Sequence, residues 1–286
     1  METDREVLDQ EAERFIKDAA IPSCPAILTQ LTQEMASDDP DLDKVSKLIG
    51  GDVSLAAALL KTVNSPFYGL RSKATSVTQA IALLGLRKFT HLITRQLLRQ
   101  AFPAGKSGLM DKFWEILPGI ARINTLLARE LKHVNDDAAH TFALFRDCGM
   151  LAMLQGLKGY APVLPGAEAG GEAGITAMED ERYGMNHARI GYHLTKTWLL
   201  PDEICLAVLR HHDYAELQAS GAGVPPAGLQ HIALTLAAES IYVTHEMGVA
   251  SAEWARGGTF ALAALEIAQD DLDGMADAVN AESADG

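Results

Sequence analysis

Apolar residues recur at three- and four-residue intervals almost throughout this chain of 286 residues. That spacing places apolar side chains on one face of an α-helix. The strict polar and apolar alternation of a half-buried strand is not sustained anywhere, and aromatic residues make up only 6% of the chain. The sequence therefore predicts an all-α protein.

Capping residues mark the ends of several predicted helices. One helix begins near Asp52 with three apolar side chains on its inner face, and it stops before Pro66, which disfavours helical geometry in the preceding residue. Ser76 and Gln79 have the spacing of a capping box that opens another helix, ending at Gly85. Further helices are predicted near residues 41–50, 86–97, 111–132, 140–157, 186–199, 202–212, 229–247 and 259–279.

A change of composition at residues 102–108 predicts a subdomain boundary. The predicted N-terminal helical subdomain covers residues 1–105, and residues 106–286 form the second helical subdomain, with an acidic helix near its end. A Gly-, Ala- and Glu-rich stretch at residues 161–174 is too poor in large apolar residues to pack, so it is predicted to be an inserted loop.

Charge and cysteine content restrict the class of function. The chain has 24 Lys and Arg against 38 Asp and Glu, a formal charge of −14, which disfavours nucleic acid and anionic membranes as general partners. The three cysteines are far apart and have apolar neighbours, as reduced thiols do. Residues 1–10 lack the pattern of a signal peptide, and no apolar stretch is long enough to span a bilayer. We therefore expect a cytoplasmic protein.

Histidines and one aspartate in the second half are the candidates for site chemistry. Helical spacing puts His187, His211 and His212 towards the protein interior, and Asp147 lies within an apolar run at residues 142–151. A carboxylate in such a run must be paired, hydrogen-bonded or bound to a metal, because an isolated buried charge is very costly. The four residues are either the remnant of a metal site or core histidines beside an ion pair of Asp147 with Arg146. Spacing alone leaves both interpretations open.

Two other features could contact a partner. Arg87, His91, Arg95 and Arg99 form a basic stripe at intervals of four residues, which is either an ordinary solvated helix face or a site for an anion or an acidic protein. The turn after residue 63 contains Asn64, Phe67 and Tyr68. That turn could expose aromatic side chains to a partner, but loop aromatics usually pack, so we favour a helix-terminating turn anchored in the core.

Seven blocks of this sequence carry a recognisable pattern, at residues 21–25, 48–52, 59–69, 80–85, 186–191, 198–201 and 211–212. Together these blocks resemble the HDOD family of bacterial signal-transduction modules over about residues 14–245. The resemblance implies an N-terminal helical bundle packed on a C-terminal subdomain related to HD-type metal phosphohydrolases. It also implies a non-enzymatic regulatory module that acts through protein–protein interaction with other signalling proteins.

The sequence departs from the pattern of the catalytic HD-type phosphohydrolases, to which this family is related. Catalytic relatives carry a His-Asp dipeptide where this chain has Arg146-Asp147, and a ligand histidine on the preceding helix, where residues 113–131 contain none. An arginine cannot coordinate a metal. The resemblance therefore implies a catalytically inactive, degenerate site that requires no cofactor and has ligands for at most one divalent ion. The alternatives are a metal-dependent HD-type phosphodiesterase and a sensor with weak nucleotide or anion binding.

Overall fold

The structure is a computed structural model that describes residues 11–19, 25–35, 37, 39–69, 73–103, 108–161 and 174–284. Every regular element within these ranges is helical and no strand occurs there, which confirms the predicted all-α class. The chain divides into two compact units, one of residues 22–103 and one that combines residues 104–286 with residues 1–21. No helix of the described ranges is long and apolar enough to cross a membrane.

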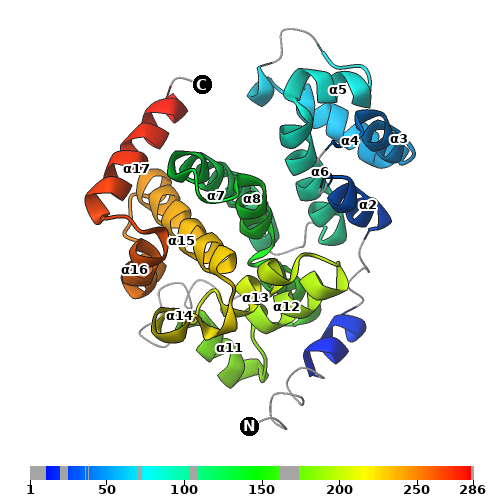
Figure 1. The fold of residues 1–286 in the computed structure, drawn as a ribbon. Coiled ribbons are helices and arrows are strands. Elements are labelled where there is room, and N and C mark those ends of the chain that lie inside the picture. The colour runs from blue at the N-terminus through cyan, green and yellow to red at the C-terminus, as the bar shows by residue number, and fades with distance from the viewer. Residues whose placement is uncertain are drawn as a thin grey trace. The chain divides into compact units, whose positions relative to one another are not determined.

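The unit of residues 22–103 is a bundle of short helices (Figure 1). Side-chain oxygens of Asp41, Asp52 and Ser76 accept backbone N–H groups at the first turns of α3, α4 and α5, as the sequence predicts for the latter two. The described elements are α2 (Ala26–Met35), α3 (Leu42–Gly50), α4 (Val53–Val63), the 3-10 turn η1 (Pro66–Tyr68), α5 (Val77–Leu84) and α6 (Leu86–Ala101).

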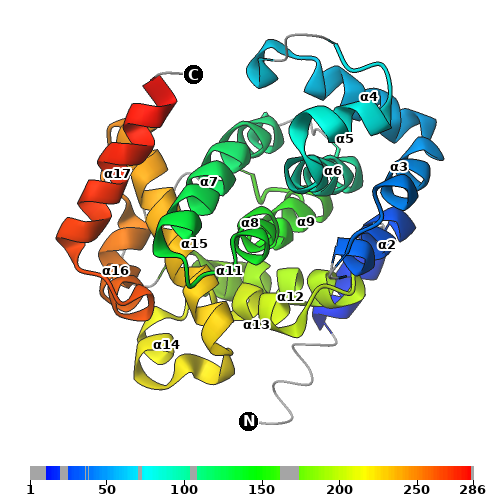
Figure 2. The same ribbon diagram turned by 45° about the horizontal axis from the view of Figure 1, so that its top comes forward.

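The larger unit is built around one long helix. Eight consecutive residues of α15 (Pro226–Met247), from His231 to Ala238, are buried, so other helices cover α15 on every side. Figure 2 shows α15 between α7 on one side and α16 and α17 on the other. The other elements are α7 (Leu109–Leu131), α8 (Asp136–Phe145), α9 (Cys148–Gly156), α11 (Gly174–Tyr183), α12 (His187–Thr197), α13 (Asp202–Arg210), α14 (Tyr214–Ser220), η2 (Gly221–Gly223), α16 (Ala252–Leu265) and α17 (Gln269–Ala284), with a helix at residues 11–18.

Two predicted helices are each two helices in the structure. The helix predicted at residues 140–157 breaks at Arg146 and Asp147 into α8 and α9, and the one predicted at residues 259–279 breaks at Glu266, which has a left-handed φ of 57°. The first prediction was wrong because both sides of the break bury apolar residues, so the apolar pattern continues across it. The helix at residues 11–18 and helices α2, α11 and α14 were not predicted. Most of the predicted loop at residues 161–174 lies outside the described residues.

Candidate metal centre

A close helix crossing brings Asp147 to His187. Asp147 precedes α9 and His187 is the first residue of α12. A Cβ added to Gly149 in α9 would lie 1.9 Å from the carbonyl oxygen of His187, so the two backbones are in direct contact there. Only glycine permits that approach, and the approach holds the loop before α9 against the start of α12.

The two other histidines come from the end of α13. His211 is the C-cap of this helix and His212 follows it. The side chain of His187 is inaccessible to solvent, and those of His211 and His212 are only 3% and 11% exposed. The three rings therefore meet in the interior of the larger unit.

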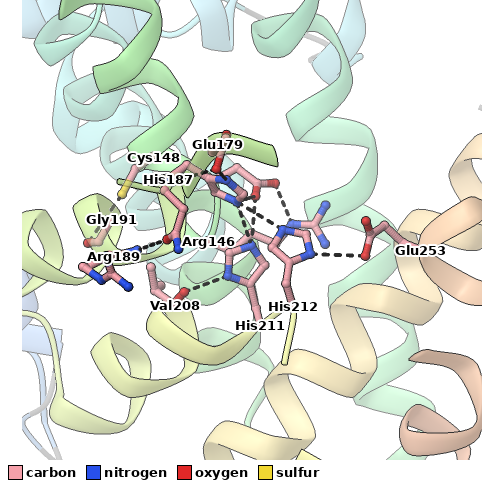
Figure 3. A network of polar contacts seen from close by, with 12 residues as sticks. Arg146, Cys148, Glu179, His187, Arg189, Gly191, Val208, His211, His212 and Glu253 are labelled. Carbon is pink, nitrogen blue, oxygen red and sulfur yellow. Dashed lines mark hydrogen bonds and ion pairs between the residues drawn. The ribbon is translucent and has the colours of Figure 1, made fainter. Parts of the chain in front are cut away.

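The rings of His187, His211 and His212 point toward one another (Figure 3), and Asp147 completes a group of four potential ligands. Their ligand atoms, one from each residue, all lie within 4.8 Å of one another. His187 Nε2 is 3.3 Å from His211 Nε2 and 3.1 Å from His212 Nε2. Asp147 Oδ1 is 3.2 Å from His211 Nε2 and 3.7 Å from His187 Nε2. The structure thus brings together the four residues that the sequence singles out.

Each ring is oriented by an acceptor on its far side. Nδ1 of His187 lies 2.7 Å from Glu179 Oε2, Nδ1 of His211 lies 2.7 Å from the carbonyl oxygen of Val208, and Nδ1 of His212 lies 3.2 Å from Glu253 Oε2. Because a carboxylate or carbonyl oxygen can only accept, we assign the proton of each ring to Nδ1. When a ring carries only this one proton, its Nε2 presents a lone pair towards the other two rings.

A second layer of polar contacts fixes these acceptors. The buried carboxylate of Glu179 also accepts from the backbone N–H of His187, and it forms a hydrogen bond with the hydroxyl of Tyr160. Glu253 accepts from the hydroxyl of Tyr214 at 2.7 Å and pairs with Arg256. Histidine ligands of metals are usually held by such carboxylate or carbonyl partners.

Asp147 is shared between the histidines and an arginine. Its Oδ2 accepts from Arg146 Nε at 2.9 Å, and Arg146 Nη2 also pairs with Glu239 Oε2 at 2.8 Å. Burial opposes ionisation of Asp147, but the Arg146 guanidinium and the nearby histidines outweigh it and hold the pKa of Asp147 well below its usual range. Asp147 is therefore a carboxylate with one oxygen, Oδ1, directed at the imidazoles.

The pKa values of His187 and His212 are shifted in opposite directions. Burial opposes protonation of His187, but the adjacent Glu179 carboxylate outweighs it and raises the pKa of His187. Burial, and then the neighbouring rings of His211 and His187, lower the pKa of His212 well below its usual value. His212 therefore resists protonation, whereas His187, beside Glu179, favours it.

The residues fit a divalent cation in charge and in donor type. With neutral imidazoles, two arginines face four carboxylates around the cluster, which leaves two negative charges without compensation. One divalent ion would compensate both. Three imidazole nitrogens and one carboxylate oxygen suit Zn²⁺ or Fe²⁺ better than Mg²⁺ or Ca²⁺.

Sequence reasoning missed the residues that orient the ligands. Glu179, Glu239 and Glu253 each lie in or beside helices with other acidic residues, and nothing in the local spacing separates a buried glutamate from its exposed neighbours. The ion pair of Asp147 with Arg146, one of the two interpretations left open, is present alongside the four-residue cluster. The structure therefore contains features of both interpretations.

The basic stripe lies on α6, in the other unit. Arg87 and Arg99 are exposed, whereas His91 and Arg95 are half-buried. Burial lowers the pKa of Arg95, and the like charge of Arg99 adds to this effect while nearby Tyr68 opposes it. Neither Arg95 nor Arg99 has a carboxylate partner in the described part of the chain.

The turn after α4 is held by its own asparagine. The amide of Asn64 donates to the carbonyl oxygen of Ala74 at 2.8 Å and accepts from its N–H at 2.7 Å. Tyr68 is half-buried, and the side chain of Phe67 lies outside the described part of the structure. Asn64 thus has an evident structural role in this turn, while a role of the turn in partner binding stays a prediction.

A family model described as the HDOD domain matches residues 21–214. The chain belongs to the HDOD domain family. The HDOD match contains all four residues of the cluster but ends before α15 and α16, which carry Glu239 and Glu253. Two of the carboxylates around the cluster therefore come from outside the family match.

Solved structures share the HDOD fold. An HDOD domain protein from Geobacter sulfurreducens is 21% identical with a TM-score of 0.66, and the match covers 96% of this chain and 98% of that one. A candidate phosphohydrolase from Shewanella amazonensis is 19% identical with a TM-score of 0.70, covering 93% of both chains. A candidate signal transduction protein from Marinobacter aquaeolei is 18% identical with a TM-score of 0.68, covering 98% of this chain and 65% of that one.

One curated relative matches at the sequence level. An uncharacterized protein of Treponema pallidum is 26% identical over an alignment of 216 positions, which covers 68% of this chain. The match covers 38% of the relative's own length. This chain therefore corresponds to part of that larger protein.

Proposed function

We propose that this protein is a non-enzymatic regulatory module of bacterial signal transduction, and that its His₃Asp cluster holds one divalent ion in a structural role. The observation that carries the proposal is the contact of Arg146 with Asp147. The oxygen of Asp147 that does not face the histidines accepts from the guanidinium. That oxygen is not available to a second metal ion.

Hydrolysis of a phosphodiester by two metal ions needs a carboxylate that bridges them, with a water positioned between them. Arg146 holds one oxygen of Asp147 and carries a permanent positive charge, so it repels a second cation beside that oxygen. Three imidazoles and one carboxylate can complete a tetrahedral shell around a single ion, which is typical of structural zinc sites. The chain's own residues thus favour binding over turnover.

The test is an assay of the purified full chain with Zn²⁺, Mn²⁺ or Fe²⁺ on cyclic dinucleotides, nucleoside triphosphates and generic phosphodiesters. We expect one ion per chain and no turnover above that of the double variant Asp147→Ala/His212→Ala. Turnover well above this control would overturn the proposal. Arg146→His offers a second comparison, because it restores a side chain that can coordinate a metal.

Partner binding is proposed for the basic stripe. From Val53 to Met110 the sequence contains eight Lys and Arg and no Asp or Glu, in a chain whose formal charge is −14. Arg95 and Arg99, which lack carboxylate partners within the described residues, lie in this acid-free stretch. The positive charge of the stripe fits an acidic segment of another signalling protein, because arginines can bind carboxylates through bidentate contacts.

The stripe is tested by capture of partners from a lysate of the native organism. The variant Arg87→Glu/Arg95→Gln/Arg99→Glu should lose a partner that the unmodified protein captures, and salt should weaken that capture. Arg95 receives Gln because it is half-buried. The variant Lys47→Glu/Lys61→Glu/Lys73→Gln changes three exposed lysines of the same unit and alters the net charge by the same amount, so it controls for charge. If the folded stripe variant still captures the partner fully, the stripe is an ordinary solvated helix face and not a binding site.

A further inference from the structure

A cation bound between the three imidazoles of the cluster would hold all three rings in their observed orientation. Their Nδ1 atoms contact acceptors, and His187 Nε2 faces the Nε2 atoms of His211 and His212 at 3.3 and 3.1 Å. Two unprotonated Nε2 atoms that face each other repel through their lone pairs, and one proton can bridge only one such pair. Without the ion, at least one ring is therefore free to turn and to take its Nδ1–H off its acceptor.

His212 is the ring that is held least firmly. Its Nδ1 lies 3.2 Å from Glu253, whereas the corresponding contacts of His187 and His211 are both 2.7 Å. Its side chain is also the most exposed of the three, at 11%. His187, in contrast, is bonded to Glu179 through its backbone as well as its ring.

The three anchors lie on different elements. Val208 belongs to α13, the helix that His211 itself caps, and Glu179 belongs to α11. Glu253 lies in the first turn of α16, beyond the end of the family match. Of the three ring anchors, Glu253 is the one that lies in the C-terminal helices (Figure 3).

Glu253 also organises the start of α16. It accepts from the hydroxyl of Tyr214 in α14 and pairs with Arg256 one turn further along α16. Ser251 caps the same turn through the backbone N–H of Trp254. A negative charge in a first turn is favourable to a helix, and the donors around Glu253 hold that charge in place.

We propose that α16 responds to occupancy of the cluster through the hydrogen bond between His212 and Glu253. When a cation is bound, His212 keeps its Nδ1–H on Glu253 and the first turn of α16 is held. When the cluster is empty, His212 turns away and Glu253 loses one of its three donors. This inference rests on the proposed metal site, and it makes α16 the element through which the site regulates the C-terminal part of the chain.

The experiment is hydrogen exchange measured by mass spectrometry on the full chain, stripped with EDTA and then saturated with Zn²⁺. Zinc binding is measured separately by calorimetry. In the unmodified protein we expect zinc to slow amide exchange in the first two turns of α16 several-fold. Glu253→Ala keeps all four ligands, so it should still bind zinc, about 10- to 100-fold more weakly, without the change in α16. Asp277→Ala, which removes an exposed carboxylate from α17, should respond like the unmodified protein.

Each outcome decides between the two proposals. If the unmodified protein binds no zinc, the metal site and this inference both fail. If it binds zinc but exchange in α16 does not change, the inference alone fails. A zinc-dependent change in α16 that persists in Glu253→Ala would assign the coupling to another contact, and it would also overturn the inference. Because the comparison of the unmodified protein with and without zinc is decisive, a failure of Glu253→Ala to fold does not remove the test.

Discussion

At the scale of single residues, the buried histidines differ in what their ring nitrogens contact. His187 and His211 have polar neighbours on both ring nitrogens. His231, in the middle of α15, is 1% exposed and stacks on Phe142, and neither of its ring nitrogens has a hydrogen-bond partner among the described residues. Burial lowers the pKa of His231 from 6.5 to about 4. This histidine is thus a neutral core residue.

We therefore expect His231 to make the fold sensitive to acid. Because its folded pKa is depressed, its contribution is complete above pH 6.5 and is lost as pH falls towards 4, where the unfolded chain binds a proton that the folded chain does not. Between pH 7 and pH 5, the free energy of unfolding of the unmodified protein should fall by about 2 kcal/mol more than that of His231→Leu. Urea unfolding of the metal-free protein at both pH values measures the difference, and an equal loss in both proteins would contradict it.

At the scale of elements, the crossing of α9 and α12 sets the geometry of the cluster. We expect Gly149→Ala to lower the free energy of unfolding by about 1–3 kcal/mol or more, because its Cβ would overlap the His187 carbonyl oxygen. It should also weaken zinc binding, since His187 must move. Gly50→Ala is the matched control, because an added Cβ there meets no atom within 4 Å. Chemical unfolding measures the first effect and calorimetry the second. An unchanged zinc affinity in Gly149→Ala would show that the crossing does not set the geometry of the cluster.

The same crossing shows how far the sequence could be used for prediction. Helical periodicity and capping residues predicted most helices, and inward-facing positions identified His187, His211 and His212, because burial of one face is a local property of the pattern. The break at Asp147 could not be predicted, since apolar residues continue through it. Glu179 and Glu253 were missed because their burial depends on α11 and α16 packing near residues that are distant in sequence.

At the scale of the whole molecule, an ion that binds only the folded chain must stabilise it. At a free Zn²⁺ concentration of 100 times its dissociation constant, the gain is about 2.7 kcal/mol, which corresponds to a rise in Tm of roughly 5–10 °C for a chain of this size. Asp147→Ala should abolish the rise. Lower pH should reduce it, because protons compete with the ion for the three imidazoles. Differential scanning calorimetry with EDTA or Zn²⁺ makes the measurement, and a rise of equal size in Asp147→Ala would contradict it.

Glu239 and Glu253 lie outside the HDOD match, and this affects where the chain can be truncated. A fragment cut at residue 214 would keep every ligand of the cluster but lose Glu239 and Glu253, which leaves Arg146 and His212 without their outer partners. It would also expose the apolar surfaces of α7 and α8 that α15 covers. The stretch that the family model matches is therefore shorter than the stretch that buries these surfaces, and we expect α15 and α16 to be needed in any transplant into another protein.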